Sequence, residues 1–407
     1  MPVCLLGGRL TARLGVKGQG VSGEVDKLRR VQALLLSFFV SALLTAWIVH
    51  VSRGPAGFML DSDVSGPQKF HSRPVPRVGG LGILGGIVSS IVMLLVLQPA
   101  EAHPFGLLLL CAVPAFGAGL VEDFTKRVSP GKRLLAAGAS AALAAWLVDA
   151  VITRSDIPGI DALVSLPVGA FALTVFAVAG ISNSVNIIDG FNGLASMCVV
   201  IMLAALTYVA FQVGDFALAT FGLACIGSVL GFFLWNFPAG LIFLGDGGAY
   251  FLGFVVAEMS LLLLARNPGV SPLFPLLVCI YPVFETVFSI YRRRFLRAVP
   301  PSMPDGIHLH SLIYRRIMRW AVGDRSSKAL TRRNSMTSPY LWVLCMLSVA
   351  PALLFWDHSA ALAGCLALFI VTYIALYWRI VRFKSPRWMK IAPRRDRLLA
   401  KADNRRT

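Results

Sequence analysis

The sequence predicts an all-α polytopic membrane protein with about eleven transmembrane helices, and three observations support this fold class. Of the 407 residues, 57% are hydrophobic and 14% are charged, whereas a soluble domain carries about 25% charged residues. A helix needs about 20 apolar residues to cross the roughly 30 Å hydrocarbon core, and eleven such runs occur. No sizeable polar insert separates them, so one helical membrane domain is the simplest organisation.

The expected spans divide the chain into a leader, a membrane domain and a tail. Residues 1–30 are basic and rich in Gly and Ser but lack the features of a secretory signal, so we expect a disordered basic leader. The membrane domain covers 31–378 and includes a long loop at 291–338, and a basic tail follows at 379–407. In order, the spans are 31–51, 79–98, 104–121, 134–152, 162–181, 194–213, 216–235, 241–264, 272–291, 339–356 and 359–378.

The net charge of +18 is divided unevenly between the two sides of the membrane. The loops after odd-numbered spans, together with the tail, carry 30 Lys and Arg residues, whereas the other inter-span loops carry only Arg154 and Arg266. By the positive-inside rule the first set is cytoplasmic. Basic residues beside membrane spans indicate membrane lipid and anionic substrates as partners, not nucleic acid.

The leader opposes this orientation, because it carries six basic residues and yet an odd number of spans places it outside. Either the stronger downstream charges hold the first span in place, or the number of spans is wrong by one. We favour the former.

Every unusual polar cluster falls in a loop that follows an odd-numbered span, or at the end of a span on that same side. The charge distribution therefore places all of them on the cytoplasmic side of the membrane. Five clusters that are distant in sequence can therefore converge, which predicts an active site at the cytoplasmic membrane surface. The clusters are 61–77, 122–133, 182–193, 244–249 and 305–316.

The central cluster, Ile181 to Ala195, inserts amides and a carboxylate between two apolar runs. Asn183, Asn186 and Asp189 recur every three residues, so a helix gathers them toward one face. Polar groups at membrane depth indicate function by default.

Asp246 stands between glycines in an apolar stretch, Gly245-Asp246-Gly247-Gly248. A carboxylate beside bare backbone N–H groups can hold a hard divalent cation while the amides meet phosphate oxygens. The alternative is an Asp helix cap beside flexible glycines.

The first cytoplasmic loop ends in cationic and hydrogen-bonding groups that suit a phosphate or pyrophosphate, and a juxtamembrane basic loop is the alternative. These groups are Lys69, His71, Arg73 and Arg77. The glycines that follow, with Gly82 and Gly86 at GxxxG spacing, indicate close helix packing.

Two adjacent carboxylates, Glu122 and Asp123, directly follow the third span. They repel each other, so one of them needs a basic partner, a metal or a raised pKa. Pairing with Lys126 or Arg127 at a solvated helix end is the alternative.

The longest loop contains His308 and His310, followed by Arg315 and Arg316. With no third His or Cys nearby, a zinc site is disfavoured. An anionic ligand suits the pair better, with Asp305 as a group that can orient one imidazole. Glu285 is expected to pair within the bundle.

Together these motifs resemble the polyprenyl-phosphate N-acetylhexosamine-1-phosphate transferases of glycosyltransferase family 4, over roughly residues 55–320. Each motif alone is weak, but all occur in the family's order and on one face. They are Pro76-Arg77-Val78-Gly79-Gly80, Asp123 with Ser129-Pro130, Asn183 to Gly190, Gly245 to Gly248, and His308-Leu309-His310.

The resemblance implies that undecaprenyl phosphate attacks the sugar-bearing phosphorus of a UDP-N-acetylhexosamine and releases UMP. It implies Mg²⁺, with Mn²⁺ as the alternative ion, and a bacterial cytoplasmic (inner) membrane. Asp246 is then the metal ligand, with Asn186; Asp123 activates or orients the lipid phosphate, and Asp189 organises the nucleotide or metal. The implied contacts to phosphates or the donor are His308, His310, Lys69, His71, Arg77, Asn183 and Arg315.

The chain departs from the family pattern at two positions. Glu122 replaces the first Asp of a pair that many members have, so we assign the chemistry to Asp123. Ser311 stands where a third His often follows, which argues against the MurNAc-pentapeptide branch. The last two spans and the tail fit the branch that begins O-antigen, capsule or teichoic acid synthesis.

Two other functions compete with a transferase. A transporter of anionic substrates also places polar residues in a bundle, but near the midplane and between repeated halves, and no internal repeat is visible. A lipid-surface scaffold leaves Asp189 and Asp246 unexplained. The hexosamine and the oligomeric state stay open, with a homodimer among the options.

Overall fold

The computed structural model describes residues 7–53, 60–61, 75–296, 307–318 and 326–382. Over these residues the protein is a bundle of helices with one short antiparallel strand pair, β1 (Leu60–Asp61) and β2 (Val75–Pro76). The helices of the first half are α1 (Gly7–Ser52), α2 (Gly79–Leu97), α3 (Pro99–Cys111), α4 (Val113–Thr125), α5 (Pro130–Leu147), α6 (Pro158–Val164), α7 (Pro167–Ile188) and α8 (Leu194–Gln212). The second half adds α9 (Phe216–Asn236), α10 (Gly245–Arg266), α11 (Leu273–Val278), α12 (Ile280–Tyr291), the π-helical turn η1 (Arg292–Leu296), α13 (Leu309–Ile313), the π-helical turn η2 (Tyr314–Met318), α15 (Ser327–Leu354) and α16 (Ser359–Val381).

The helical polytopic prediction is confirmed, whereas the number eleven is not. In the described part of the chain, eight helices are long and apolar enough to cross a membrane, and α3 with α4, bent by 41°, form a ninth if counted as one span. Helix α5 and the broken pair α11 and α12 occupy the remaining two predicted spans. Helix α5 carries Lys132 and Arg133 in its first turn, and α11 ends after six residues, so neither is counted as a span.

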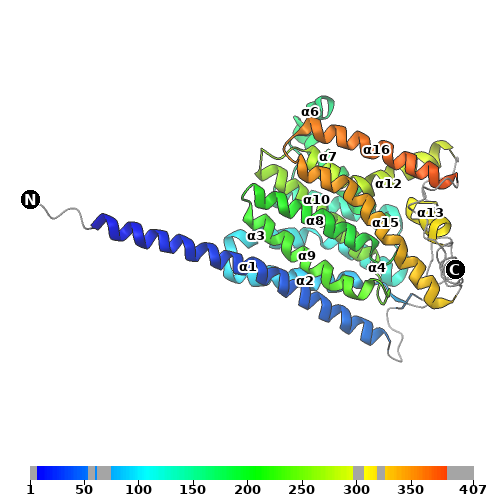
Figure 1. Ribbon diagram of the computed structural model, residues 1–407, viewed down its shortest axis with the longest axis horizontal. Coiled ribbons are helices and arrows are strands. Elements are labelled where there is room, and N and C mark those ends of the chain that lie inside the picture. Colours follow the sequence, from blue (N-terminus) through cyan, green and yellow to red (C-terminus); the bar gives the residue numbers. More distant parts are fainter. Residues whose placement is uncertain (1–6, 54–59, 62–74, 297–306, 319–325, 383–407) are drawn as a thin grey trace, which may run out of the picture.

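The leader differs from the prediction, because α1 is already helical at Gly7. Extending a helix costs less than starting one, so the long apolar stretch that follows can carry its helical conformation back into the Gly- and Ser-containing leader. Figure 1 shows the N-terminal part of α1 projecting beyond the rest of the bundle.

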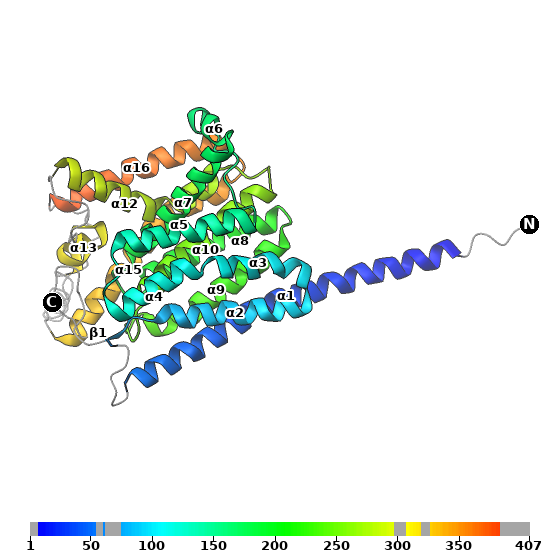
Figure 2. The same ribbon diagram turned by 180° about the vertical axis from the view of Figure 1, so that it is seen from behind.

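Helix α10 forms the centre of the bundle and packs against α7, α4, α2 and α8. Of its most apolar window, 89% is buried, and the helices surround it in both ribbon views (Figures 1 and 2). Its glycines lie so close to neighbouring helices that side chains would collide: a Cβ on Gly253 would lie 2.5 Å from Ser182 Cα. Close backbone approach is therefore what places the first turn of α10 among the ends of α2, α4 and α7.

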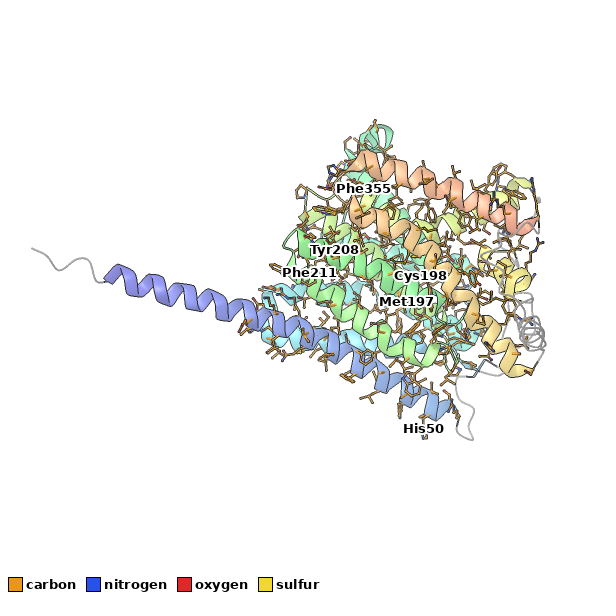
Figure 3. All side chains as sticks on the ribbon, viewed as in Figure 1. His50, Met197, Cys198, Tyr208, Phe211 and Phe355 are labelled. Atoms are coloured by element: carbon orange, nitrogen blue, oxygen red, sulfur yellow. The ribbon has the colours of Figure 1, made fainter. Side chains whose placement is uncertain are left out.

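The predicted role of Gly82 and Gly86 in packing is confirmed. A Cβ on Gly82 would collide with the Thr45 hydroxyl of α1, and one on Gly86 would lie 2.5 Å from the Ser37 carbonyl oxygen. Side chains fill the remaining space between the helices, as along α8 between Met197 and Tyr208 (Figure 3).

The helix ends separate into two groups, as the loop parity predicted. At one end, hereafter the site end, Gly79 and Gly80 N–H of α2 donate to the Phe243 and Leu244 carbonyls before α10, each at 3.0 Å. At the opposite end the Ser271 and Ser359 hydroxyls, which precede α11 and begin α16, lie 2.7 Å apart.

Candidate active site

Asp123, in the last turn of α4, caps the N-terminus of α10. Its Oδ1 accepts the Asp246 N–H and its Oδ2 accepts the Gly247 N–H, both at 2.9 Å. The first N–H groups of a helix have no partner within that helix, and here a carboxylate from another helix satisfies two of them. The helix-cap role considered for Asp246 thus belongs to Asp123, which leaves the Asp246 side chain available for other contacts.

Asp246 lies at the centre of a group of nitrogen donors at the site end. Asn186 Nδ2 donates to its Oδ1 at 2.9 Å, and Arg77 Nη2 lies 3.8 Å from the same oxygen. Arg133 Nη1 donates to Oδ2. The Asp246 side chain is only 15% exposed, so these groups replace most of its water. Residues predicted from three distant clusters therefore meet at one carboxylate.

Arg133 is the residue of this site that the sequence motifs did not identify. It lies in the first turn of α5, and its guanidinium carbon is 5.8 Å from the centre of the Tyr250 ring. The Tyr250 hydroxyl in turn donates to Asn183 Oδ1 at 2.9 Å. A cation in the first turn opposes the helix dipole, but Lys132 stands in the same turn, so the sequence does not single out Arg133.

Asp189 follows the last residue of α7 and lies near both the Asp246 cluster and the histidines. It is repelled by Asp246 and Asp123 and attracted by Arg77, and burial raises its pKa to about 7. The next residue, Gly190, lies beside the histidines, because a Cβ there would be 3.4 Å from His310 Nε2.

The two histidines form a stacked pair that Glu285 holds in place. Their ring centres are 5.1 Å apart with an interplanar angle of 15°. Glu285 Oε1 lies 3.0 Å from His308 Nδ1 and accepts the Leu309 N–H at 3.1 Å. The prediction that Glu285 pairs within the bundle is confirmed. Asp305, expected to orient a histidine, lies outside the described residues.

The remaining predicted residues lie outside the described part of the chain, on η2, or at the turn after α4. Lys69 and His71 lie outside the described residues. Arg315 is exposed on η2, so its role stays a prediction. Glu122 accepts the Val128 N–H at 2.7 Å and so fixes the turn after α4. This local contact supports the choice of Asp123 over Glu122.

The donor set fits a hard divalent cation bound together with substrate, and not a metal enclosed by protein ligands. No group of three or more His, Cys, Asp or Glu side chains in the described ranges is arranged to hold a metal. Mg²⁺ typically uses one or two carboxylates, waters and substrate phosphates. Asp246 with the Asn186 amide supplies such a partial set, and the nearby charges of Asp123 and Asp189 favour a cation.

Comparison with known proteins agrees with the motifs. A family model described as glycosyl transferase family 4 matches residues 105–264. The phospho-N-acetylmuramoyl-pentapeptide-transferase of Geobacillus sp. (strain WCH70) is 30% identical over 246 residues, which are 57% of this chain and 74% of that protein. The chain belongs to glycosyl transferase family 4.

Two further relatives of this family 4 protein match over more of its length. A probable undecaprenyl-phosphate N-acetylglucosaminyl 1-phosphate transferase of Bacillus subtilis (strain 168) is 29% identical over 303 residues, 73% of this chain and 81% of that protein. An undecaprenyl-phosphate alpha-N-acetylglucosaminyl 1-phosphate transferase of Thermotoga maritima is 29% identical over 289 residues, 70% of this chain and 81% of that protein. The family and the apolar helices together identify an integral membrane protein.

Proposed function

We propose that this protein transfers an N-acetylhexosamine 1-phosphate from a UDP-N-acetylhexosamine to undecaprenyl phosphate and releases UMP. The names of the relatives support a phospho-sugar transferase that acts on a polyprenyl phosphate. The observation that carries the proposal is the cluster around Asp246, where two arginines, an amide and a helix N-terminus meet one carboxylate. This set can bind a pyrophosphate and a divalent cation together.

Arg77 and Arg133 are the groups that bind the pyrophosphate oxygens in this proposal. Guanidinium groups match phosphate oxygens with paired N–H donors, and both lie beside the positive end of the α10 dipole. Asp246 and Asn186 would hold Mg²⁺, or Mn²⁺ as the alternative ion. When bound, such an ion neutralises the charge that develops on the transferring phosphoryl group.

The reaction requires that an oxygen of the lipid phosphate form a bond to the sugar-bearing phosphorus. The bond from that phosphorus to the bridging oxygen breaks, and its electron pair leaves with UMP. A phosphate monoester has a second pKa near 6, so its oxygen is already an anion at pH 7 and needs no general base. Since both Asp123 oxygens accept N–H groups of α10, Asp123 acts by positioning the Asp246 turn.

The site end faces the cytoplasm of a bacterial cell in this proposal. The loops at that end carry nearly all the basic residues between the spans, which supports a cytoplasmic orientation. The nucleotide donor is then supplied from the cytoplasm and the lipid acceptor from the inner leaflet. The product would begin the synthesis of a cell-surface polysaccharide of the O-antigen, capsule or teichoic acid type.

The deciding experiment measures UMP release by the purified protein with undecaprenyl phosphate and a panel of UDP-N-acetylhexosamines, with and without Mg²⁺. We expect release with at least one sugar, and loss of release in Asp246→Asn. Wild-type turnover in Asp246→Asn would disprove the metal assignment. No release with any sugar would disprove the proposal, and uptake of UDP-sugar into proteoliposomes would then favour the transporter.

A further inference from the structure

Helix α16, the last in the described part of the chain, presents two buried tyrosines to the segment that carries the histidines. Tyr373 and Tyr377 are four residues apart and so share one helix face, and their exposed fractions are 0% and 2%. Helix α16 lies beside α12 in both ribbon views (Figures 1 and 2), and it lies outside the residues that the family model matches.

Tyr373 reaches His308 through Glu285. The Tyr373 hydroxyl donates to Glu285 Oε2, while Oε1 accepts from His308 and from the Leu309 N–H. Glu285 is 1% exposed, and a buried carboxylate is costly unless hydrogen bonds compensate the water it has lost. Three donors from two separate segments therefore fix the orientation of the Glu285 carboxylate. The carboxylate in turn fixes the orientation of the His308 imidazole.

Tyr377 holds the residue just before His308 through Arg292. The Tyr377 hydroxyl accepts from Arg292 Nη1 at 2.8 Å, and the same nitrogen donates to the Ile307 carbonyl at 2.9 Å. The Tyr377 hydroxyl also donates to the Ile307 carbonyl at 3.3 Å. Arg292 is 3% exposed, so this link is buried like the first.

We propose that α16 is part of the catalytic unit, with Tyr373 and Tyr377 as positioning residues that fix the His308 imidazole. The inference rests on the proposed function. Because Glu285 engages Nδ1, Nε2 is the His308 nitrogen that meets the substrate. A neutral ring accepts a hydrogen bond there, whereas a protonated ring donates one to an anionic oxygen of the donor.

The test compares Tyr373→Phe with Tyr208→Phe, the same change on a ring of α8 that is 48% exposed. We expect kcat to fall about tenfold in Tyr373→Phe, as for loss of a hydrogen bond to a charged group, with little change in KM. The melting temperature should fall as well, because the buried Glu285 carboxylate loses one of its donors. In a His308→Gln background, Tyr373→Phe should lower kcat almost no further, because the effects of substitutions at coupled residues are not additive. An equal loss in both backgrounds, or no loss beyond that of Tyr208→Phe, would overturn the inference.

A second measurement does not depend on turnover. Diethyl pyrocarbonate modifies imidazole nitrogens, and mass spectrometry of the peptide that contains His308 gives its rate. We expect faster modification in Tyr373→Phe than in Tyr208→Phe at a temperature at which both variants are fully folded, and equal rates would contradict the positioning role. Should the wild type release no UMP, the proposed function fails while this comparison still decides the role of Tyr373.

Discussion

The Arg133 guanidinium donates to the Asp246 carboxylate although 113 positions separate the two residues in the sequence. The side chains are 12% and 15% exposed, so both are largely shielded from water. Asp246 is thereby held from one side by Arg133 of α5 and from the other by Asn186 of α7. The first turn of α10 is the point at which these helix ends are joined.

Replacement of Arg133 tests whether this ion pair serves the reaction. We expect Arg133→Ala to lower kcat/KM for the UDP-sugar about 100-fold, as when one positioned donor to a developing charge is removed. Lys132→Ala is the matched control, since Lys132 is the exposed neighbour in the same turn. Equal effects of the two changes, measured by UMP release, would show that Arg133 contributes only to the general positive charge of the surface.

The sequence predicted the helical membrane fold and most of the site residues, because both depend on patterns that a single chain displays. Long apolar runs specify helices in a membrane, since backbone groups must be satisfied internally there. The loop parity then placed Arg77, Asp123, Asn186 and Asp246 at one end, and the structure joins all four by direct contacts.

The links between these residues were not predictable, because they depend on packing distances. Nothing local marks Tyr250 as the bridge between Arg133 and Asn183, or Glu285 as a partner of His308. The number of spans is not confirmed for a related reason. The predicted span 272–291 is divided into α11 and α12, and apolar composition alone does not show this division.

Asp123 and Glu122 make different contacts, so their amide variants should differ. Asp123→Asn replaces one of the two oxygens that accept the α10 N–H groups, and an unsatisfied buried donor costs about 1–3 kcal/mol. We expect a lower melting temperature and a fall in kcat of about tenfold or more. Glu122→Gln keeps an oxygen for the Val128 N–H and should be nearly neutral. A larger effect of Glu122→Gln on UMP release would mean that the chemistry belongs to Glu122.

Gly245 sits at a junction where only glycine fits. Its φ is +78°, and a Cβ would collide with the Arg77 carbonyl and lie 2.6 Å from Asp123 Oδ2. We expect Gly245→Ala to abolish UMP release and to reduce the yield of folded protein. Gly117→Ala in α4 is the control, since a Cβ there has no neighbour within 4 Å. Full activity of Gly245→Ala would show that the contact between the Arg77 loop and α10 is dispensable.

The Asp189 carboxylate should lower the melting temperature at neutral pH, relative to an amide at this position, when divalent cations are absent. Its pKa of about 7 in the folded protein lies above the ordinary value of 3.8, so the folded state binds the proton more tightly than the unfolded chain. The bound proton therefore stabilises the folded state fully at pH values below the pKa of the unfolded chain. This stabilisation is lost as the pH rises through 7. In EDTA we therefore expect Asp189→Asn to melt higher than the wild type at pH 8, with a smaller difference at pH 5. A difference that does not change with pH would contradict the raised pKa of this carboxylate.

Asp246 should determine the affinity for divalent cations even without turnover. Its carboxylate and the Asn186 amide are the proposed protein ligands, and Mn²⁺ can stand in for Mg²⁺ while giving a paramagnetic signal. We expect Asp246→Asn to weaken Mn²⁺ binding about tenfold or more in the presence of UDP-sugar, followed by electron paramagnetic resonance, because one charged ligand is lost. Asp161→Asn is a matched control, since Asp161 lies at the opposite end and accepts hydrogen bonds from Ser155. If Asp246→Asn binds Mn²⁺ like the wild type, the carboxylate holds the arginines and not the metal, and the ion is bound through the substrate phosphates alone.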